Sequence, residues 1–349
     1  MGGDRVPYDA QSVDAPLSRF AIFLVLTVRD GGAALRTVRD VISRIDDLVK
    51  TVGFRDLNAS LSCVVGIGSA LWDRLSPDAR PAELRPFEPI AGAVHSAPST
   101  PGDLLFHIRA ERVDLCFEFE RLLLDALGDA VTVADETQGF RYFDARDLLG
   151  FVDGTANPKG LDLPDATLIG DEDEAFAGGS YVVIQKYLHD LDRWAALSTE
   201  QQEAIIGRTK ADNVELPDAA GPQLAHKTLA TIDDGAGGEI DILRDNMPFG
   251  RPGHGEFGTF FIGYTRHLWV IELMLRRMFI GEPVGFHDRI LDVSRAVTGS
   301  TFFVPAGTVL AALGSPTAAE ASASGDAEAF TDQDTNAGDG SLGIGSLKD

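Results

Sequence analysis

The order of strand-like and helix-like segments in the first half of the chain limits its fold more than any other feature of the sequence. Residues 20–28 (FAIFLVLTV) form an unbroken apolar run, which is typical of a buried strand. The pattern then predicts a helix over 35–49, strands over 61–67 and 103–108, a helix over 111–127 and a strand that begins at 131. This β-α-β-β-α-β order is that of a ferredoxin-like unit.

A looser version of the same order follows in the second half. It predicts strands over 180–187, 258–264 and 301–304, and helices over 199–206 and 267–279. We therefore expect an α+β fold of the dimeric α+β barrel type, built from two ferredoxin-like domains in which helices pack on antiparallel sheets. The expected domains are residues 1–145 and residues 146–314.

The composition changes at residue 315. The segment that follows is rich in Ala, Ser, Gly and Asp, and it holds too few apolar residues to offset the entropy of ordering it. Leu342, Ile344 and Leu347 then return after this polar spacer. We therefore expect residues 315–349 to form a disordered tail that ends in a short docking peptide.

The charge of the chain excludes several classes of partner. The chain has 54 acidic and 30 basic residues, and its formal net charge is −24 at pH 7. Nucleic acid and anionic membrane surfaces are poor partners for such a chain, because both require a basic surface. The polar N-terminus is unlike a signal peptide, and no apolar run approaches the roughly 18 residues of a membrane span. We expect a cytoplasmic protein.

Two segments combine polar side chains in a way that suggests a reactive site. In GFVDGTANP (150–158), two glycines flank Asp153 in a turn, which would present a carboxylate for acid–base work or serve as an ordinary Asx-turn. In ILRDNMPFG (242–250), Arg244 and Asn246 alternate, so both would face the same way on an extended segment. A guanidinium beside an amide suits a developing oxyanion, although a surface salt bridge would produce the same pattern.

Histidine and cysteine spacing excludes the common metal motifs. The chain has 7 histidines and 2 cysteines, without HExxH or CxxC, so zinc-hydrolase and zinc-ribbon sites lack their ligands. His226 stands in GPQLAHKT, and a single imidazole can serve as the axial ligand of haem iron. Spacing alone does not distinguish His226 from the other histidines.

Taken together, seven ordered motifs between about residues 140 and 305 resemble those of the B-type dye-decolourising peroxidases. These motifs are GFVDGTANP, IQKYLHDLDRW, GRTKADNVEL, AHKT, ILRDNMPFG, GTFFIGYTR and TGSTFFVP. The N-terminal half fits the first ferredoxin-like domain of that family, so the resemblance covers nearly all of the chain except the tail. It implies a haem b peroxidase that reduces hydrogen peroxide through a ferryl intermediate. Dyes, phenolic or lignin-related donors and Mn(II) would be its reducing substrates.

The resemblance also assigns roles to individual residues. It implies that His226 is the proximal ligand of the haem iron and that Asp288 accepts the other ring N–H of this histidine. Asp153, Arg244 and Asn246 would form the catalytic group on the distal side. Gly154 of the same turn and Arg208 of GRTK would contact the cofactor.

One position departs from the family motif, which usually reads DGTENP. Residue 156 is alanine here, which leaves Asp153 in place but removes a carboxylate near the expected pocket mouth. Glu215 and Glu239 lie in acidic stretches near the same motifs and could bind Mn(II), since oxygen ligands suit a hard divalent cation. With Ala156 in place, we expect Mn(II) to be a poor donor.

The resemblance extends to the partners. The terminal SLGIGSLK resembles the targeting peptide that loads peroxidases of this family into encapsulin shells, which implies docking through residues 342–348 inside such a compartment. A homo-oligomer is also expected.

Two other hypotheses remain open at this point. One is a haem carrier or sensor on the same fold, which needs no peroxide-cleaving pair, and the other is an acidic interaction protein without haem.

Overall fold

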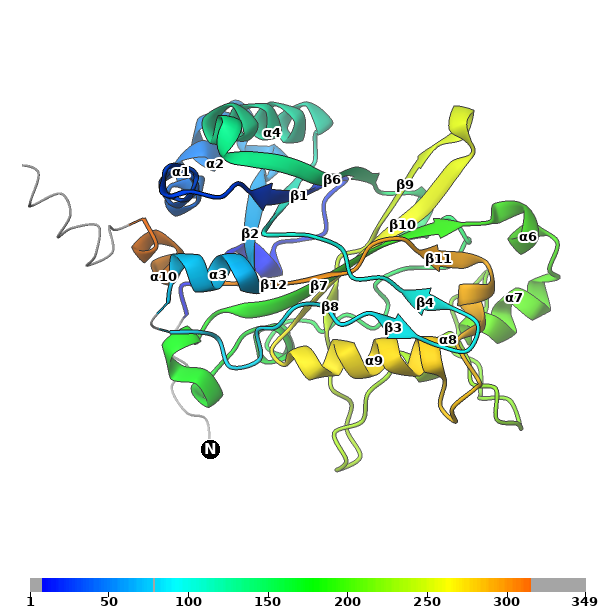
Figure 1. The fold of residues 1–349 in the computed structure, drawn as a ribbon. Helices are drawn as coiled ribbons and strands as arrows, with labels where there is room; N and C mark the ends of the chain where they lie inside the picture. The colour runs from blue at the N-terminus through cyan, green and yellow to red at the C-terminus, as the bar shows by residue number, and fades with distance from the viewer. Residues whose placement is uncertain (1–7, 78, 315–349) are drawn as a thin grey trace, which may run out of the picture. The chain divides into compact units, whose positions relative to one another are not determined.

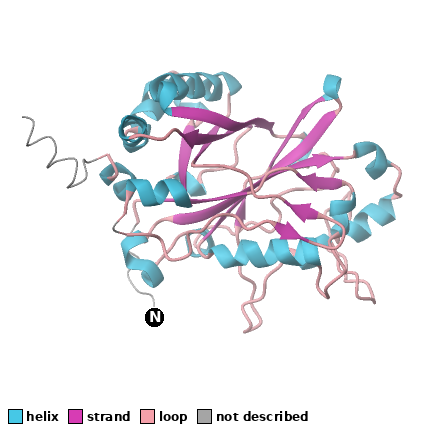
Figure 2. Cartoon of the chain, in the orientation of Figure 1, coloured by secondary structure: helices cyan, strands magenta, loops and turns pink. Residues whose placement is uncertain are grey.

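A ten-stranded antiparallel sheet runs through the computed structural model, which describes residues 8–77 and 79–314 (Figure 1, Figure 2). The strand order is β6-β1-β5-β2-β12-β7-β10-β8, with β11 paired to β7 and β9 paired to β10. The strands are β1 (Phe20–Val28), β2 (Ser62–Gly68), β5 (Leu104–Ala110), β6 (Val131–Phe140), β7 (Ser180–His189), β8 (Leu243–Arg244), β9 (Met247–Arg251), β10 (Glu256–Thr265), β11 (Ser294–Ala296) and β12 (Ser300–Val304). A separate hairpin pairs β3 (Ile90–Ala91) with β4 (Ser96–Ala97).

The two halves of the chain meet where β2 pairs with β12. Phe302 lies opposite Gly68 and Phe303 opposite Ile67, so strands from the two halves continue one sheet. The predicted α+β fold with ferredoxin-like antiparallel units is confirmed. The domain division at residue 145 stays a prediction, and the tail at 315–349, with its terminal peptide, lies outside the described residues.

Helices flank the sheet (Figure 2), and they are grouped here by the half of the chain that carries them. The first-half group is α1 (Gly32–Ser43), α2 (Ile45–Gly53), α3 (Ser69–Leu75) and α4 (Val113–Leu127). The second-half group is α5 (Asp162–Thr167), α6 (Leu191–Ala195), α7 (Thr199–Ile206), α8 (His226–Leu229), α9 (Leu268–Ile280) and α10 (Gly307–Ala312). Short 3-10 segments include η7 (Arg289–Asp292). No helix among the described residues is long and apolar enough to cross a membrane.

Strand alternation divides the core into clusters on the two faces of the sheet. In β1, Leu24 and Leu26 belong to the cluster that includes the helix residues, whereas Phe23 and Val25 belong to a second cluster. There the ring of Phe23 stacks on that of Phe260 from β10, with centroids 4.1 Å apart. Successive side chains of a strand point to opposite faces, so β1 is buried on both. This explains why residues 20–28 are apolar throughout.

One predicted helix differs from the structure. The stripe over 35–49 is divided into α1 and α2 at Arg44, whose φ of −119° is not helical. The apolar stripe continues across the break, because Ile42 and Ile45 are both buried. The periodicity therefore identified the buried face but not the bend within it.

Candidate functional site

Four of the predicted site residues surround one pocket, which we call the main pocket. His226, Asp153, Arg244 and Asn246 all line it. Most other lining side chains are apolar, and they are Leu149, Phe151, Val152, Ile206, Ala230, Phe261, Met274, Leu275, Met278 and Ile290.

His226 begins the short helix α8 and is oriented by a buried carboxylate. Its Nδ1 lies 2.6 Å from Oδ2 of Asp288, whose side chain is fully buried. The other oxygen of Asp288 accepts the amide N–H of Ile290 at 3.0 Å, which fixes the carboxylate at the start of η7. Burial is the largest single influence and opposes protonation of His226, but the charge of Asp288, its hydrogen bond and the charge of Asp153 together outweigh it, so the pKa of the imidazole is raised.

The other ring nitrogen of His226 is available to a ligand. Within the described part of the chain, no group hydrogen-bonds to Nε2, and the side chain lines the main pocket. A histidine that donates Nδ1–H to a carboxylate keeps a lone pair on Nε2, as metal-bound histidines do. The predicted contact between His226 and Asp288 is present in the structure.

Asp153 occupies the turn that the sequence indicated, but it is partly buried rather than exposed. Its Oδ1 accepts the amide N–H of Gly154 at 2.7 Å and lies 3.5 Å from Nδ2 of Asn246. Burial raises the pKa of Asp153, and these two donors together with Arg244 oppose the rise. Gly154 has a φ of +70°, in the left-handed region that favours glycine.

Arg244 and Asn246 face the main pocket together, as their alternation predicted. Asp245 between them is buried outside that pocket and forms an ion pair of 3.0 Å with Arg109. The guanidinium of Arg244 donates to the carbonyl of Ala230 at 3.2 Å. Asn246 accepts the amide N–H of Ile262 at 3.2 Å, which holds its side chain in place.

Sequence reasoning missed Asn157, which joins the two motifs. Its side-chain amide donates to the carbonyl of Arg244 at 2.7 Å and accepts the amide N–H of Arg244 at 3.0 Å. The turn that carries Asp153 is thereby attached to the backbone of Arg244. A lone asparagine before a proline gives no sign of a partner 87 residues away.

A second cavity, which we call the side cavity, shares Asp153, His226, Arg244 and Asn246 with the main pocket. Its further lining includes Gly154, Ala156, Arg208, Glu215, Lys227 and Glu239. Nε of Arg208 donates to Asn213 at 2.9 Å, and Lys227 lies 2.7 Å from Glu215. The structure therefore brings both predicted manganese ligands to one cavity. Glu215, however, is paired with Lys227, which lowers the pKa of its carboxyl group.

The residues present fit the haem that the resemblance implies. A large planar macrocycle needs apolar walls, one nitrogen donor with a lone pair and cations for its two propionates. The main pocket supplies the walls and Nε2 of His226, and the adjoining side cavity supplies Arg208 and Lys227, both of which pair with Glu215 in this structure. The chemistry of this donor set is that of a haem site with a single histidine ligand.

The comparisons with known proteins agree with this chemistry. The sequence model of "Dyp-type peroxidase, N-terminal" matches residues 10–141, and that of "Dyp-type peroxidase, C-terminal" matches residues 144–309. The curated dye-decolorizing peroxidase of Mycobacterium tuberculosis is 56% identical over 295 residues, which are 84% of this chain and 88% of that protein. The curated dye-decolorizing peroxidase of Rhodococcus erythropolis is 50% identical over 343 residues, which are 98% of each chain.

Solved structures of similar sequence belong to the same family of peroxidases. DyPB from Rhodococcus jostii is 60% identical with a TM-score of 0.86, and the match covers 89% of this chain and all of that one. A variant of that protein has been solved in complex with heme, and a DypB variant has been solved in complex with manganese. The encapsulated DyP-type peroxidase from Mycobacterium smegmatis is 53% identical with a TM-score of 0.84, covering 88% of this chain and 98% of that one. The chain belongs to the Dyp-type peroxidase family and is a haem-dependent peroxidase.

Proposed function

We propose that His226 holds the haem iron through Nε2 and that Asp288 sets the orientation and basicity of this ligand. The support is the 2.6 Å contact between Nδ1 and a fully buried carboxylate, together with the position of His226 in the lining of the main pocket. A carboxylate that accepts the ring N–H makes the imidazole a stronger electron donor. We assign Arg208 to a propionate and Gly154 to the backbone close to the cofactor, since both line the adjoining side cavity.

Bound haem would supply the iron at which the peroxide O–O bond is cleaved, and it would hold the two oxidising equivalents that hydrogen peroxide delivers. The protein must move a proton from the inner to the outer oxygen of hydrogen peroxide. Asp153 is the base for this transfer when it is ionised, and Arg244 favours that ionised form. The fixed charge of Arg244 also stabilises the departing oxygen, while Asn246 donates toward Asp153 and limits its movement.

A narrow cavity between the two halves offers peroxide a route to this group. It shares Asp153, Arg244 and Asn246 with the main pocket, and Tyr142 and Arg146 are among its other lining residues. Hydrogen peroxide is small enough to enter through such a cavity, and we propose that dyes and phenolic or lignin-related donors, which are much larger, transfer electrons from outside.

We keep Mn(II) as a weak donor, bound by Glu215 and Glu239. Both line the side cavity, and hard divalent cations take oxygen ligands. Two features disfavour tight binding of Mn(II). Residue 156 is alanine, so a third carboxylate is absent there, and Glu215 already accepts a hydrogen bond from Lys227. A Dyp-type peroxidase variant has been solved with manganese, which makes the family's chemistry compatible with such a site.

We further propose that residues 342–348 dock the enzyme inside an encapsulin shell. We also propose that the chain forms a homo-oligomer. The boundary between its two domains is proposed to lie at residue 145. The apolar pattern of Leu342, Ile344 and Leu347 and the encapsulated relative from M. smegmatis support the docking role. Size-exclusion chromatography with light scattering measures the oligomer. A monomer at working concentration would remove that part of the proposal.

The assignment of peroxide chemistry rests on one observation: Asp153, Arg244 and Asn246 line the same pocket. Stopped-flow mixing of the haem-loaded enzyme with hydrogen peroxide tests it. We expect Arg244→Leu to slow the first spectral change by about 100-fold or more, the usual loss for one charge-stabilising donor, with haem still bound. Arg251→Leu is the matched control, because Arg251 is exposed and pairs only with Glu256 within the described residues. An unchanged rate in Arg244→Leu would reject this role and would favour the alternative hypothesis of a haem carrier or sensor.

A further inference from the structure

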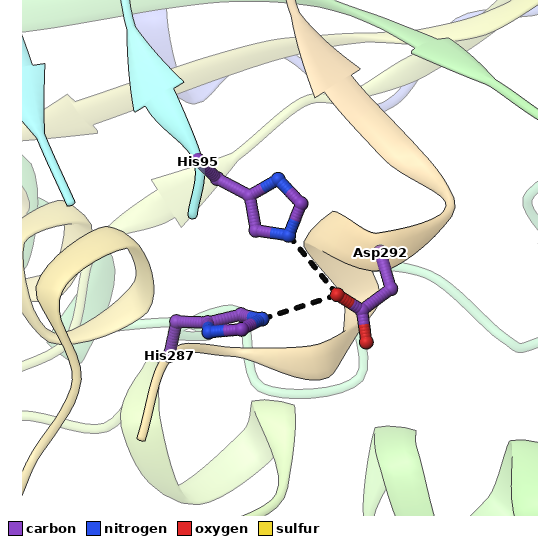
Figure 3. Close-up of side chains that lie close together, drawn as sticks. All are labelled: His95, His287 and Asp292. Atoms are coloured by element: carbon purple, nitrogen blue, oxygen red, sulfur yellow. Dashed lines mark hydrogen bonds and ion pairs between the residues drawn. The ribbon is translucent and has the colours of Figure 1, made fainter. Parts of the chain in front are cut away.

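Two histidines and one aspartate meet at a second place in the fold, which we call the His–His–Asp cluster (Figure 3). Nε2 of His95 lies 3.0 Å from Oδ1 of Asp292, and Nε2 of His287 lies 3.1 Å from the same oxygen. The two imidazole rings meet edge to face with centroids 4.7 Å apart. The peroxidase chemistry described above uses none of these residues.

The elements that carry the cluster are held firmly. His95 follows the turn of the β3–β4 hairpin, where its carbonyl accepts the amide N–H of Gly92 at 2.9 Å. A Cβ at Gly92 would lie 2.0 Å from the carbonyl oxygen of Phe279, so the hairpin sits against the last turns of α9. His287 is held through its carbonyl, which accepts from the side chain of Gln223 at 3.0 Å. The three side chains are therefore placed by tertiary structure.

The spacing of the donor atoms suits a metal ion. A tetrahedral zinc site with ligand distances of about 2.0–2.2 Å places its donors roughly 3.3 Å from one another. The two nitrogen-to-oxygen distances of 3.0 and 3.1 Å are close to this value, and all ligand atoms lie within 4.8 Å of one another. For a metal ion to bind, each imidazole would carry its proton on Nδ1, so that both Nε2 lone pairs face the cluster, and Oδ1 of Asp292 would move away from the point on which the two nitrogens now converge.

The surroundings favour a cation and give it access. His95 and Asp292 line an open surface cavity, whose lining also includes the acidic side chains of Asp190 and Asp192 and the basic side chain of Arg295. The cluster side chains are 24%, 19% and 28% exposed for His95, His287 and Asp292, so water can complete a coordination shell. Two arginines lie nearby: Nε of Arg289 is 3.8 Å from the second oxygen of Asp292, and Arg295 lines the same cavity.

We propose that His95, His287 and Asp292 bind a divalent transition-metal ion of the Zn²⁺ class, with water at the open positions. Imidazole ligands select Zn²⁺, Cu²⁺ or Ni²⁺ over Mg²⁺ and Mn²⁺, which separates this site from the carboxylates of the side cavity. The ion ties the β3–β4 hairpin to η7. Asp288 directly follows His287 and caps the start of η7, so the bound metal would stabilise the segment that orients His226.

The test uses the full-length haem-loaded enzyme after treatment with a chelator that leaves haem in place. Isothermal titration with Zn²⁺ should give one strong site per chain, and Mg²⁺ should not compete. We expect His95→Ala and Asp292→Asn each to weaken Zn²⁺ binding at least 10-fold. His254→Ala is the matched control, since His254 is exposed and lies outside the cluster. Zn²⁺ should also raise the Tm of the wild type but not that of His95→Ala.

Electron paramagnetic resonance of bound Cu²⁺ identifies the ligands independently of stability. The wild type should show splitting from two nitrogens, His95→Ala from one, and His254→Ala from two. Binding that is unchanged in His95→Ala, or that is lost equally in His254→Ala, would overturn the proposal. Failure to bind Zn²⁺ would do the same. None of these readouts uses peroxide turnover, so they stand apart from the peroxidase assignment.

Discussion

Replacing Asp288 by asparagine tests how the protein prepares His226 for iron. The wild-type carboxylate is fully buried, 2.6 Å from Nδ1 of His226, and it also accepts the amide N–H of Ile290. Asparagine has nearly the same shape but offers only one accepting oxygen. If that oxygen keeps the bond to Ile290, the NH₂ group faces Nδ1 and donates to it. The proton of the imidazole then moves to Nε2, the atom that should hold iron.

The size of the effect follows from the lost contact. A hydrogen bond to a charged group contributes about 1.5–3 kcal/mol, which corresponds to roughly 10- to 150-fold in an equilibrium constant. This agrees with the roughly 10- to 100-fold losses seen when partners of metal-bound histidines are removed. We therefore expect Asp288→Asn to release haem about 10 to 100 times faster than the wild type.

Transfer of haem to excess apomyoglobin, followed by absorbance, measures this rate. Glu282→Gln is the matched control, because Glu282 lies on the same segment but is 60% exposed and pairs with Arg277. The control should release haem at the wild-type rate. A rate for Asp288→Asn within twofold of the wild type would refute the argument that this carboxylate sets the state of His226.

Three further predictions concern the catalytic group, the side cavity and the tail. Because burial raises the pKa of Asp153, kcat/KM for peroxide should fall on acidification at a pH above the ordinary aspartate value of about 3.9. Asp153→Asn should lower the rate and remove that acidic limb from the pH profile, and a retained limb would assign it to another group. Ala156→Glu should lower KM for Mn(II), and an unchanged KM would argue against a manganese site at Glu215 and Glu239. Truncation after residue 314 should leave haem content and turnover unchanged but abolish co-purification with a co-expressed encapsulin shell, and full packaging of the truncated enzyme would exclude the docking role.

The sequence predicted the regular elements well where apolar residues cover a whole strand or helix face. β1 and α7 begin and end where the pattern placed them. The bend at Arg44 was not predicted, because the apolar stripe runs on through Ile42 and Ile45. The β3–β4 hairpin was also missed, since strands of two residues are too short for a periodic signal.

The candidate site was predictable in parts that depend on local spacing. Arg244 and Asn246 are two residues apart on extended backbone, so alternation alone places them on one side. The contact of His226 with Asp288 spans 62 residues and came only from the family resemblance. Neither local spacing nor the family resemblance indicated Asn157 or the His–His–Asp cluster. The cluster joins residues 197 positions apart, a meeting that depends on how α9 and the β3–β4 hairpin pack.

Ligation of the haem iron by His226 is the central claim, and substitution of this residue tests it most directly. The Soret spectra of His226→Ala and His189→Ala, purified with haem supplied, should differ clearly. His189 also lines the main pocket, but both of its ring nitrogens are engaged, with Thr259 at 2.9 Å and Ser294 at 2.8 Å. We predict that His226→Ala loses its Soret band and regains it when imidazole is added, while His189→Ala keeps haem. A full Soret band and normal turnover in His226→Ala without imidazole would contradict the account.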